Sequence, residues 1–173
     1  FLEDWTFATD RPPPTGASYL KRASGEGEHL VQVVASGPDL DTFAIHKMLF
    51  GAVTTARQRV WLTTPYFVPS DSLQLALISA AERGVAVTIV LPARNDSALV
   101  HSASRSTFDD LLAAGVKLVA FERGLLHTKS ITVDGHTSVF GSVNLDMRSF
   151  YLNFEISLFV YDRELTGRLL ELQ

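Results

Sequence analysis

The most informative spacing in this sequence is a histidine and a lysine that stand two residues apart. His127 and Lys129 fall in an apolar segment that predicts a β-strand within residues 125–133. Because alternate side chains of a strand point to the same face, the imidazole and the ammonium are expected to emerge together. An imidazole supplies a nucleophile or a proton donor near neutral pH, and a neighbouring positive charge stabilises phosphoryl oxygens. The pair therefore predicts chemistry on phosphate esters.

A second group of polar residues follows the next predicted strand. Gly141, Ser142 and Asn144 come directly after residues 137–140, which would return antiparallel to the first strand. A hydroxyl and a carboxamide two residues apart can donate hydrogen bonds to phosphate oxygens, and the glycine permits a close backbone approach. Glu155 begins a further strand and is available to orient an imidazole. We expect its side chain to lie opposite an apolar set made of Phe154, Ile156, Leu158 and Val160.

Asp134 belongs to the same stretch, but its position predicts a different kind of contribution. It occupies an Asp-Gly turn, the usual connection of a tight β-hairpin. An ideal strand does not place Asp134 on the face that carries Lys129. Its expected role is therefore structural, or to position the residues that contact the substrate without contacting the substrate itself.

In order and spacing, these residues resemble the signature of the phospholipase D superfamily. The matching pattern is His127-x-Lys129-x-x-x-x-Asp134, then Gly141-Ser142-x-Asn144, then Glu155. Within that superfamily the flanking segments resemble the second half of bacterial cardiolipin synthases; these segments are residues 63–69, 124–127, 144–149 and 153–155. Residues 1–5 likewise resemble the segment after the first motif of those enzymes.

The resemblance implies a site that is shared between two halves, each with one His-x-Lys motif, whereas this sequence has one. It implies that a histidine of the other half attacks phosphorus and that His127 acts first as general acid and then as general base. Lys129, Ser142 and Asn144 would hold the phosphoryl oxygens, and Glu155 would orient the other half's histidine. Asp134 would complete the catalytic set. No metal and no cofactor are expected.

The amino-acid composition limits which binding partners are expected for this chain. The sequence contains no cysteine, which excludes disulfides, thiolate metal sites and cysteine nucleophiles. Its net charge is −4 and it has no cluster of Lys and Arg, so nucleic acid is a disfavoured partner. The expected partners are a phospholipid substrate, a membrane surface, and either a missing N-terminal half or a second copy in a homodimer. The expected location of the intact protein is the bacterial cell membrane.

Around these residues, apolar strand-like runs alternate with amphipathic stretches. This pattern predicts an α/β fold with a mixed β-sheet sandwiched between helices. Strands are expected at residues 30–35, 60–64, 85–91, 116–121, 125–133, 137–140 and 154–161. Helices are expected at residues 41–56, from residues 70–72 to Gly84, at 97–114 and from 163 onward.

The sequence also predicts a division into two parts. Residues 1–28 are rich in Pro, Gly and charge and are expected to form a connector after a missing first half, followed by a catalytic domain at residues 29–173. Because Phe1 is not a methionine, we expect a piece of a longer protein. The leading function is phosphatidyl transfer that makes cardiolipin and glycerol. The alternatives are hydrolysis by a phospholipase or phosphodiesterase, or a non-catalytic module.

Three further features leave two interpretations open. Tyr66, Phe67 and Val68 could line a lipid groove at a strand end or could simply be packed in the core. Arg148 could reach a phosphate or could brace the preceding loop by bonding carbonyls. The remaining histidines have no paired ligands at metal spacing, so structural or surface roles are expected for them; they are His29, His46, His101 and His136.

Overall fold

The computed structural model describes residues 2–12, 27–39, 43–94 and 103–173. Its elements, in chain order, are α1 (Leu2–Thr9), β1 (Leu30–Ser36), α2 (Ala44–Thr55), β2 (Arg59–Thr63), β3 (Phe67–Val68), α3 (Asp71–Glu82), β4 (Ala86–Pro92), α5 (Phe108–Ala113), β5 (Lys117–Phe121), β6 (Ser130–Val133), β7 (Thr137–Gly141), β8 (Leu145–Asp146), α6 (Met147–Tyr151), β9 (Glu155–Tyr161) and α7 (Arg163–Leu172).

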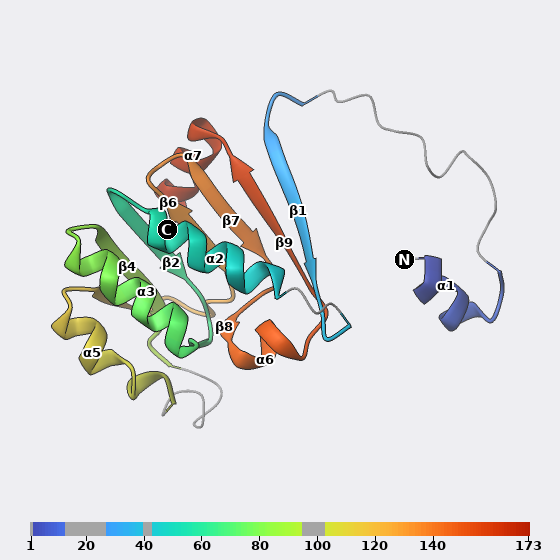
Figure 1. The fold of residues 1–173 in the computed structure, drawn as a ribbon, viewed down its shortest axis with the longest axis horizontal. Coiled ribbons are helices and arrows are strands. Elements are labelled where there is room, and N and C mark those ends of the chain that lie inside the picture. The colour runs from blue at the N-terminus through green and yellow to red at the C-terminus, as the bar shows by residue number, and fades with distance from the viewer. Residues whose placement is uncertain (1, 13–26, 40–42, 95–102) are drawn as a thin grey trace.

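A seven-stranded mixed sheet forms the centre of the fold (Figure 1), with the strand order β1-β9-β7-β6-β2-β4-β5. Strands β2, β4 and β5 run parallel, whereas β6, β7, β9 and β1 pair antiparallel. The parallel part is built from strands connected through helices, and the antiparallel part contains the β6–β7 hairpin. A separate pair, β3 with β8, lies beyond the main sheet. The predicted α/β class with a mixed sheet is confirmed.

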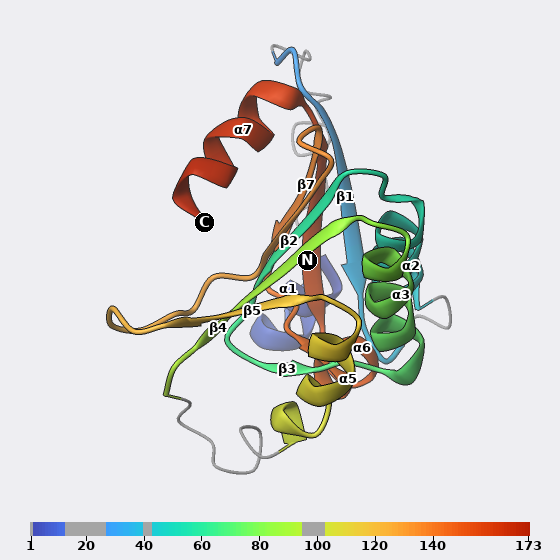
Figure 2. The ribbon, with the colours of Figure 1, turned by 90° about the vertical axis from the view of Figure 1, so that its left-hand side faces the viewer.

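Helices cover both faces of the sheet (Figure 2), as the sequence predicted. Helices α2 and α3 lie on one face and α7 on the other. The spacing of Ile45, Leu49 and Val53 turns one stripe of α2 into the core, where these side chains are at most 2% exposed. On the opposite face, the Ser138 and Thr166 hydroxyls lie 2.7 Å apart and connect β7 to α7. Burial of the apolar stripes is the main force that holds the three layers together.

Polar side chains cap the first turns of α3 and α7. The hydroxyl of Ser70 accepts a hydrogen bond from the Leu73 N–H and so caps the N-terminus of α3. Gly84 follows the C-terminus of that helix and has a positive φ of 88°. The carboxylate of Asp162 caps α7 by accepting from the Leu165 N–H at 2.7 Å. Within the described residues, no helix combines the length and the apolar character that a bilayer crossing requires.

Several boundaries differ from the predictions. The strand expected within residues 125–133 begins only at Ser130, where the pairing with β2 and β7 begins. The sequence analysis also missed α1, which lies within the predicted connector, and the short elements β3, β8 and α6. The connector residues 13–26, the start of the helix expected at 41–56 and residues 97–102 of the helix expected at 97–114 lie outside the described residues.

Glu155 lies opposite Phe154 and Ile156, as expected, but these two apolar side chains face solvent and not the core. Phe154 and Ile156 are 74% and 52% exposed, whereas Ser157 and Phe159 are buried. Because side chains alternate along β9, Glu155 lies on the same face as Ser157 and Phe159, toward α2. The inward face at this end of the strand is therefore the polar one.

Asp134 ties the β6–β7 turn to the start of β2. Its carboxylate accepts hydrogen bonds from the backbone N–H groups of Arg57, Gln58 and Arg59 at 2.8 to 2.9 Å. Its own N–H donates to the Arg59 carbonyl at 2.9 Å. Partial burial would raise the pKa of the Asp134 carboxyl, but the three N–H donors outweigh it and hold the pKa below its ordinary value.

We predict that Asp134→Asn lowers the free energy of unfolding by about 1–2 kcal/mol at neutral pH, because an amide replaces one accepting oxygen with a donor. Asn tolerates the positive φ of 52° found at this position, so the backbone should not change. The folded pKa lies below the unfolded one, so this stabilisation is full above the unfolded pKa and is lost as pH falls through the folded value.

Urea denaturation between pH 3 and pH 7 checks this prediction, with Glu82→Gln on the exposed end of α3 as control. The difference between the unmodified protein and Asp134→Asn should shrink below about pH 4. A difference that stays constant across that range would contradict the assignment.

Candidate active site

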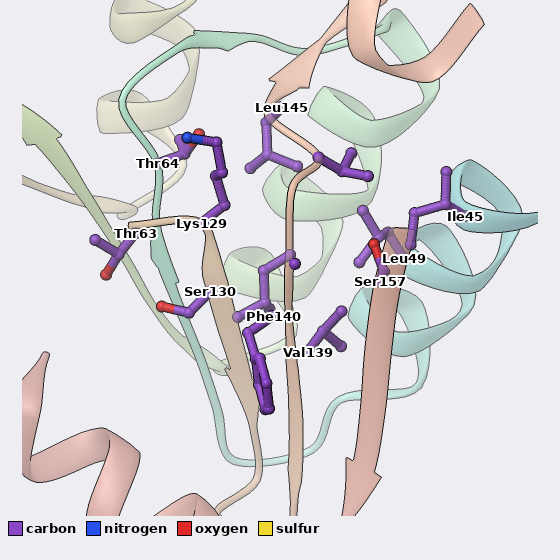
Figure 3. Close-up of a pocket in the computed structure, with 13 residues that line it drawn as sticks. Ile45, Leu49, Thr63, Thr64, Lys129, Ser130, Val139, Phe140, Leu145 and Ser157 are labelled. Carbon is purple, nitrogen blue, oxygen red and sulfur yellow. The ribbon is translucent and has the colours of Figure 1, made fainter. Parts of the chain in front are cut away.

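The site lies at the edge of the sheet where the parallel strands β2 and β4 end. Lys129 immediately precedes β6, and Thr64 immediately follows β2. Figure 3 shows the ammonium of Lys129 reaching toward Thr64, with Leu145 across from it. Ser130 and Thr63 belong to the other face, where both hydroxyls bond the Gln173 amide near α7. The alternation of β6 therefore separates Lys129 from the buried polar contacts of α7.

His127 and Lys129 meet as the sequence predicted, although they precede the strand instead of lying on it. The Lys129 Nζ lies 3.4 Å from each ring nitrogen of His127 and donates to the His127 carbonyl at 3.0 Å. Only one ring nitrogen of a neutral imidazole can accept, so the ammonium rests against the ring and does not form two hydrogen bonds to it. The ring itself is exposed and open to a ligand.

The ammonium of Lys129 is half-buried, and this changes its acidity. Burial holds the pKa of Lys129 below its ordinary value, while the carboxylates of Glu155 and Asp146 act against the decrease. Both carboxylates therefore lie close enough to act on Lys129 although neither is near it in the sequence. A positive charge that contacts His127 and is influenced by two carboxylates is suited to bind an anionic oxygen.

Gly141 sets how closely β7 approaches β9. A Cβ atom at this position would collide with the Ile156 carbonyl and lie 2.8 Å from the Ser157 Cα. The predicted close approach is thus confirmed, but its neighbour is the backbone of β9. The Gly141 N–H also points at the Lys129 carbonyl at 3.4 Å, which extends the β6–β7 ladder to the site.

Ser142 continues the pairing with β9 through its side chain. Its Oγ accepts from the Ile156 N–H at 3.0 Å, and its N–H donates to the Ile156 carbonyl at 3.0 Å. The hydroxyl proton makes only a long contact of 3.4 Å with the same carbonyl. Because that contact is weak, the hydroxyl can turn its proton toward a ligand.

Asn144 begins the loop that α6 holds in place. Its Nδ2 donates to the Ser149 Oγ at 3.4 Å, and within the described residues its buried Oδ1 has no hydrogen-bond partner. The loop is fixed because the Asp146 carboxylate caps α6 by accepting from the Ser149 N–H at 2.7 Å. His46 of α2 packs edge-on against Phe150, with ring centroids 5.1 Å apart, and so supports the same helix.

Glu155 is held by Asn153, which Arg148 holds in turn, and the sequence analysis placed neither of these two residues in the site. The Asn153 Nδ2 donates to the Glu155 Oε1 at 3.0 Å, and the Arg148 Nε donates to the Asn153 Oδ1 at 3.3 Å. The interpretation that Arg148 bonds carbonyls of the preceding loop is therefore wrong in its partner, because the acceptor is the side-chain amide of Asn153, which follows Arg148 in the sequence. The only sequence signal for Asn153 was its place directly before the motif glutamate.

The structure brings four of the six predicted residues to one edge of the sheet around the fixed ammonium; these are His127, Lys129, Ser142 and Glu155, with Asn144 in the adjoining loop. Asp134 is not brought there, because it lies at the far end of β6 and bonds the backbone before β2. Its inclusion in the catalytic set is therefore corrected to a structural role. Among the described residues, no group of His, Asp and Glu has the arrangement of a metal site.

Comparison with known proteins gives a consistent picture. The family model described as "Cardiolipin synthase, PLD-like domain" matches residues 49–172. Cardiolipin synthase A of Cronobacter sakazakii is 50% identical over 98% of this chain and 35% of its own length. Cardiolipin synthase A of Edwardsiella ictaluri is 51% identical over 92% of this chain and 33% of its own length. The chain thus spans about a third of these relatives.

Solved structures share the fold. Nuc from Salmonella typhimurium, a phospholipase D family member, superposes with a TM-score of 0.72 at 25% identity, covering 83% of this chain and 91% of that one. Phosphatidylserine synthase from Haemophilus influenzae superposes with a TM-score of 0.64 at 20% identity, covering 82% of this chain and 36% of that one. The second comparison supports the fold alone.

We predict that Glu155→Gln lowers the pKa of Lys129 further, because it removes a carboxylate that favours the charged ammonium. The alkaline limit of any activity or anion binding that needs the ammonium should move to lower pH. NMR titration of the lysine side chains, assigned through Lys129→Arg, measures the shift directly. Glu164→Gln on the exposed first turn of α7 serves as control, and an unchanged Lys129 titration in Glu155→Gln would refute the coupling.

Proposed function

This chain belongs to the family described as "Cardiolipin synthase, PLD-like domain", and from that premise we propose that it supplies one half of a phosphatidyltransferase site. The reaction joins two phosphatidylglycerol molecules and yields cardiolipin and glycerol. The observation that carries this proposal is the contact of the Lys129 ammonium with the His127 ring, on a sheet edge that also holds Glu155. A proton-transfer group beside a fixed cation suits attack on a phosphodiester.

The first chemical step forms a phosphohistidine. A histidine nitrogen from the other half of the site attacks phosphorus, and the bond between phosphorus and the glycerol oxygen breaks. His127 donates its proton to that oxygen, so that glycerol leaves as a neutral alcohol. Lys129 stabilises the negative charge that builds on the non-bridging oxygens, and the Ser142 hydroxyl and the Asn144 amide are placed in the adjoining strand end and loop to assist.

The second step reverses the proton transfer. The hydroxyl of a second phosphatidylglycerol gives its proton to His127 and attacks phosphorus, and the bond between phosphorus and histidine breaks. Water in place of that hydroxyl would give phosphatidic acid, the product of a phospholipase. Product analysis with the full-length protein and labelled phosphatidylglycerol tests the proposal. Cardiolipin with free glycerol is expected, and phosphatidic acid as the main product would favour hydrolysis.

Glu155 orients the histidine of the other half. Asn153 bonds one oxygen of its carboxylate, and the side chain is only partly buried at the start of β9. The carboxylate can therefore accept a hydrogen bond from an imidazole N–H of the other half. Such a bond fixes the imidazole tautomer and directs the other ring nitrogen toward phosphorus. Asp134 contributes by holding the β6–β7 hairpin and not by touching the substrate.

The other half is either a preceding segment of the same protein or a second copy of this chain. The relatives named above are about three times as long as this chain, which supports the first arrangement. A phospholipid substrate also requires the intact protein to work at a membrane surface, so we place it at the bacterial cell membrane.

We predict that His127→Ala in the full-length protein lowers turnover of phosphatidylglycerol by about 100- to 10,000-fold, because glycerol then leaves without a proton. A substrate with a nitrophenol leaving group should lose far less, since nitrophenolate departs without protonation. Steady-state rates on both substrates make the comparison, with His136→Ala in the exposed β6–β7 turn as control. Equal losses on the two substrates would show that His127 is not the general acid.

We also predict that this chain alone, as a monomer, has no measurable transferase activity, because the attacking histidine is absent from it. Light scattering fixes the oligomeric state while activity is measured on phosphatidylglycerol micelles. Supplying a separate segment that carries another His-x-Lys motif should restore turnover. Robust activity from a proven monomer would overturn the shared site.

A further inference from the structure

An apolar cavity opens beside the catalytic edge, between the ends of β4 and β5 and the helix α5. It has a volume of about 370 Å³, which lies within the range of ligand pockets. Phe67, Leu91, Phe108 and Leu118 contribute to its walls, and within the described residues Ser104 is its only polar side chain. Its walls suit an uncharged, apolar occupant, because a charged group would lose its water without gaining a partner.

The cavity lies beside a second one that His127 lines. A second cavity of about 350 Å³ is lined by Tyr66, Arg94 and His127. The two cavities share Pro65, which follows β2, and Pro92, which ends β4. One molecule can therefore place a polar group against His127 and extend an apolar tail past the two prolines.

Exposed leucines mark the surface around the two cavities. Leu112 of α5 lines the apolar cavity and is 53% exposed, and Leu125 lines the cavity of His127 and is 87% exposed. Isolated exposed leucines are common, but these two stand at the openings of adjoining cavities. They offer an apolar approach from a lipid surface to both cavities.

We infer that the apolar cavity between β4, β5 and α5 binds an acyl chain of the phospholipid whose phosphate is held at His127 and Lys129. This inference rests on the proposed function and adds the position of the acyl chain to it. Phe67 then belongs both to the packed core, at 1% exposure, and to the lipid-binding wall. Burial of each methylene favours binding by about fourfold, so chain length should control affinity.

Ala120→Phe tests the cavity by filling it. Ala120 is exposed at the end of β5 and lines the cavity, so a larger side chain there enters the acyl site without replacing a core residue. In the full-length protein, kcat/KM for long-chain phosphatidylglycerol should fall by about tenfold or more if two methylenes are displaced. Turnover of bis(4-nitrophenyl) phosphate, which has no acyl chain, should stay within about twofold of the unmodified rate.

Ala86→Phe is the matched control. Ala86 is also exposed on a strand, but it begins β4 at the opposite end from the cavity. It should change neither substrate. Equal losses of Ala120→Phe on both substrates, or no loss on either, would overturn the acyl site.

A direct measurement separates this inference from the proposed function. Phosphatidylglycerol with a diazirine near the end of one acyl chain is photolysed with the full-length His127→Ala protein, and the crosslinked peptides are identified by mass spectrometry. Crosslinks to α5 and β5 are expected, with loss of these in Ala120→Phe. Turnover by the unmodified protein without such crosslinks refutes the acyl site alone. Crosslinks there, with no phosphatidyl transfer by the unmodified protein, refute the proposed function alone.

Discussion

The close approach of β7 to β9 at Gly141 is the constraint on which the site depends. No Cβ atom fits between Gly141 and the Ile156 carbonyl, so the two backbones can come together only because the residue is glycine. The Ser142 Oγ then takes the place of a backbone acceptor for the Ile156 N–H. Together with the bond from the Gly141 N–H to the Lys129 carbonyl, this pairing aligns β6, β7 and β9. Glu155 therefore arrives next to Lys129, although 26 positions separate them in the sequence.

The cation at this end of the sheet is the partly buried ammonium of Lys129, which two carboxylates influence. Burial weakens the hold of Lys129 on its proton, and Glu155 and Asp146 strengthen it. The acidic groups are themselves held, Glu155 by Asn153 and Asp146 by its cap on α6. A preorganised charge of this kind stabilises a developing phosphoryl anion without first reorganising water.

The same edge of the sheet combines polar and apolar surfaces because two kinds of strand end there. The antiparallel strands position Lys129, Ser142 and Glu155, whereas Pro65 follows the parallel strand β2 and Pro92 is the last residue of β4. Proline has no N–H to offer a neighbouring strand, and β5 and α5 add apolar walls beside the two prolines. Polar and apolar cavity walls therefore adjoin at this end of the sheet, which supports the acyl site proposed above.

The sequence by itself determined the α/β class, the start and end of α3, the core stripe of α2 and the meeting of His127 with Lys129. These depend on local propensity and on side-chain periods of two and 3.6, which are written along the chain. Only the tertiary structure decided that Asp134 bonds residues 57–59, that Ser142 pairs with β9, that Phe154 and Ile156 face outward, and that an apolar cavity adjoins His127. Each of these facts joins segments that are distant in sequence, and neither spacing nor propensity encodes which backbone a side chain will meet.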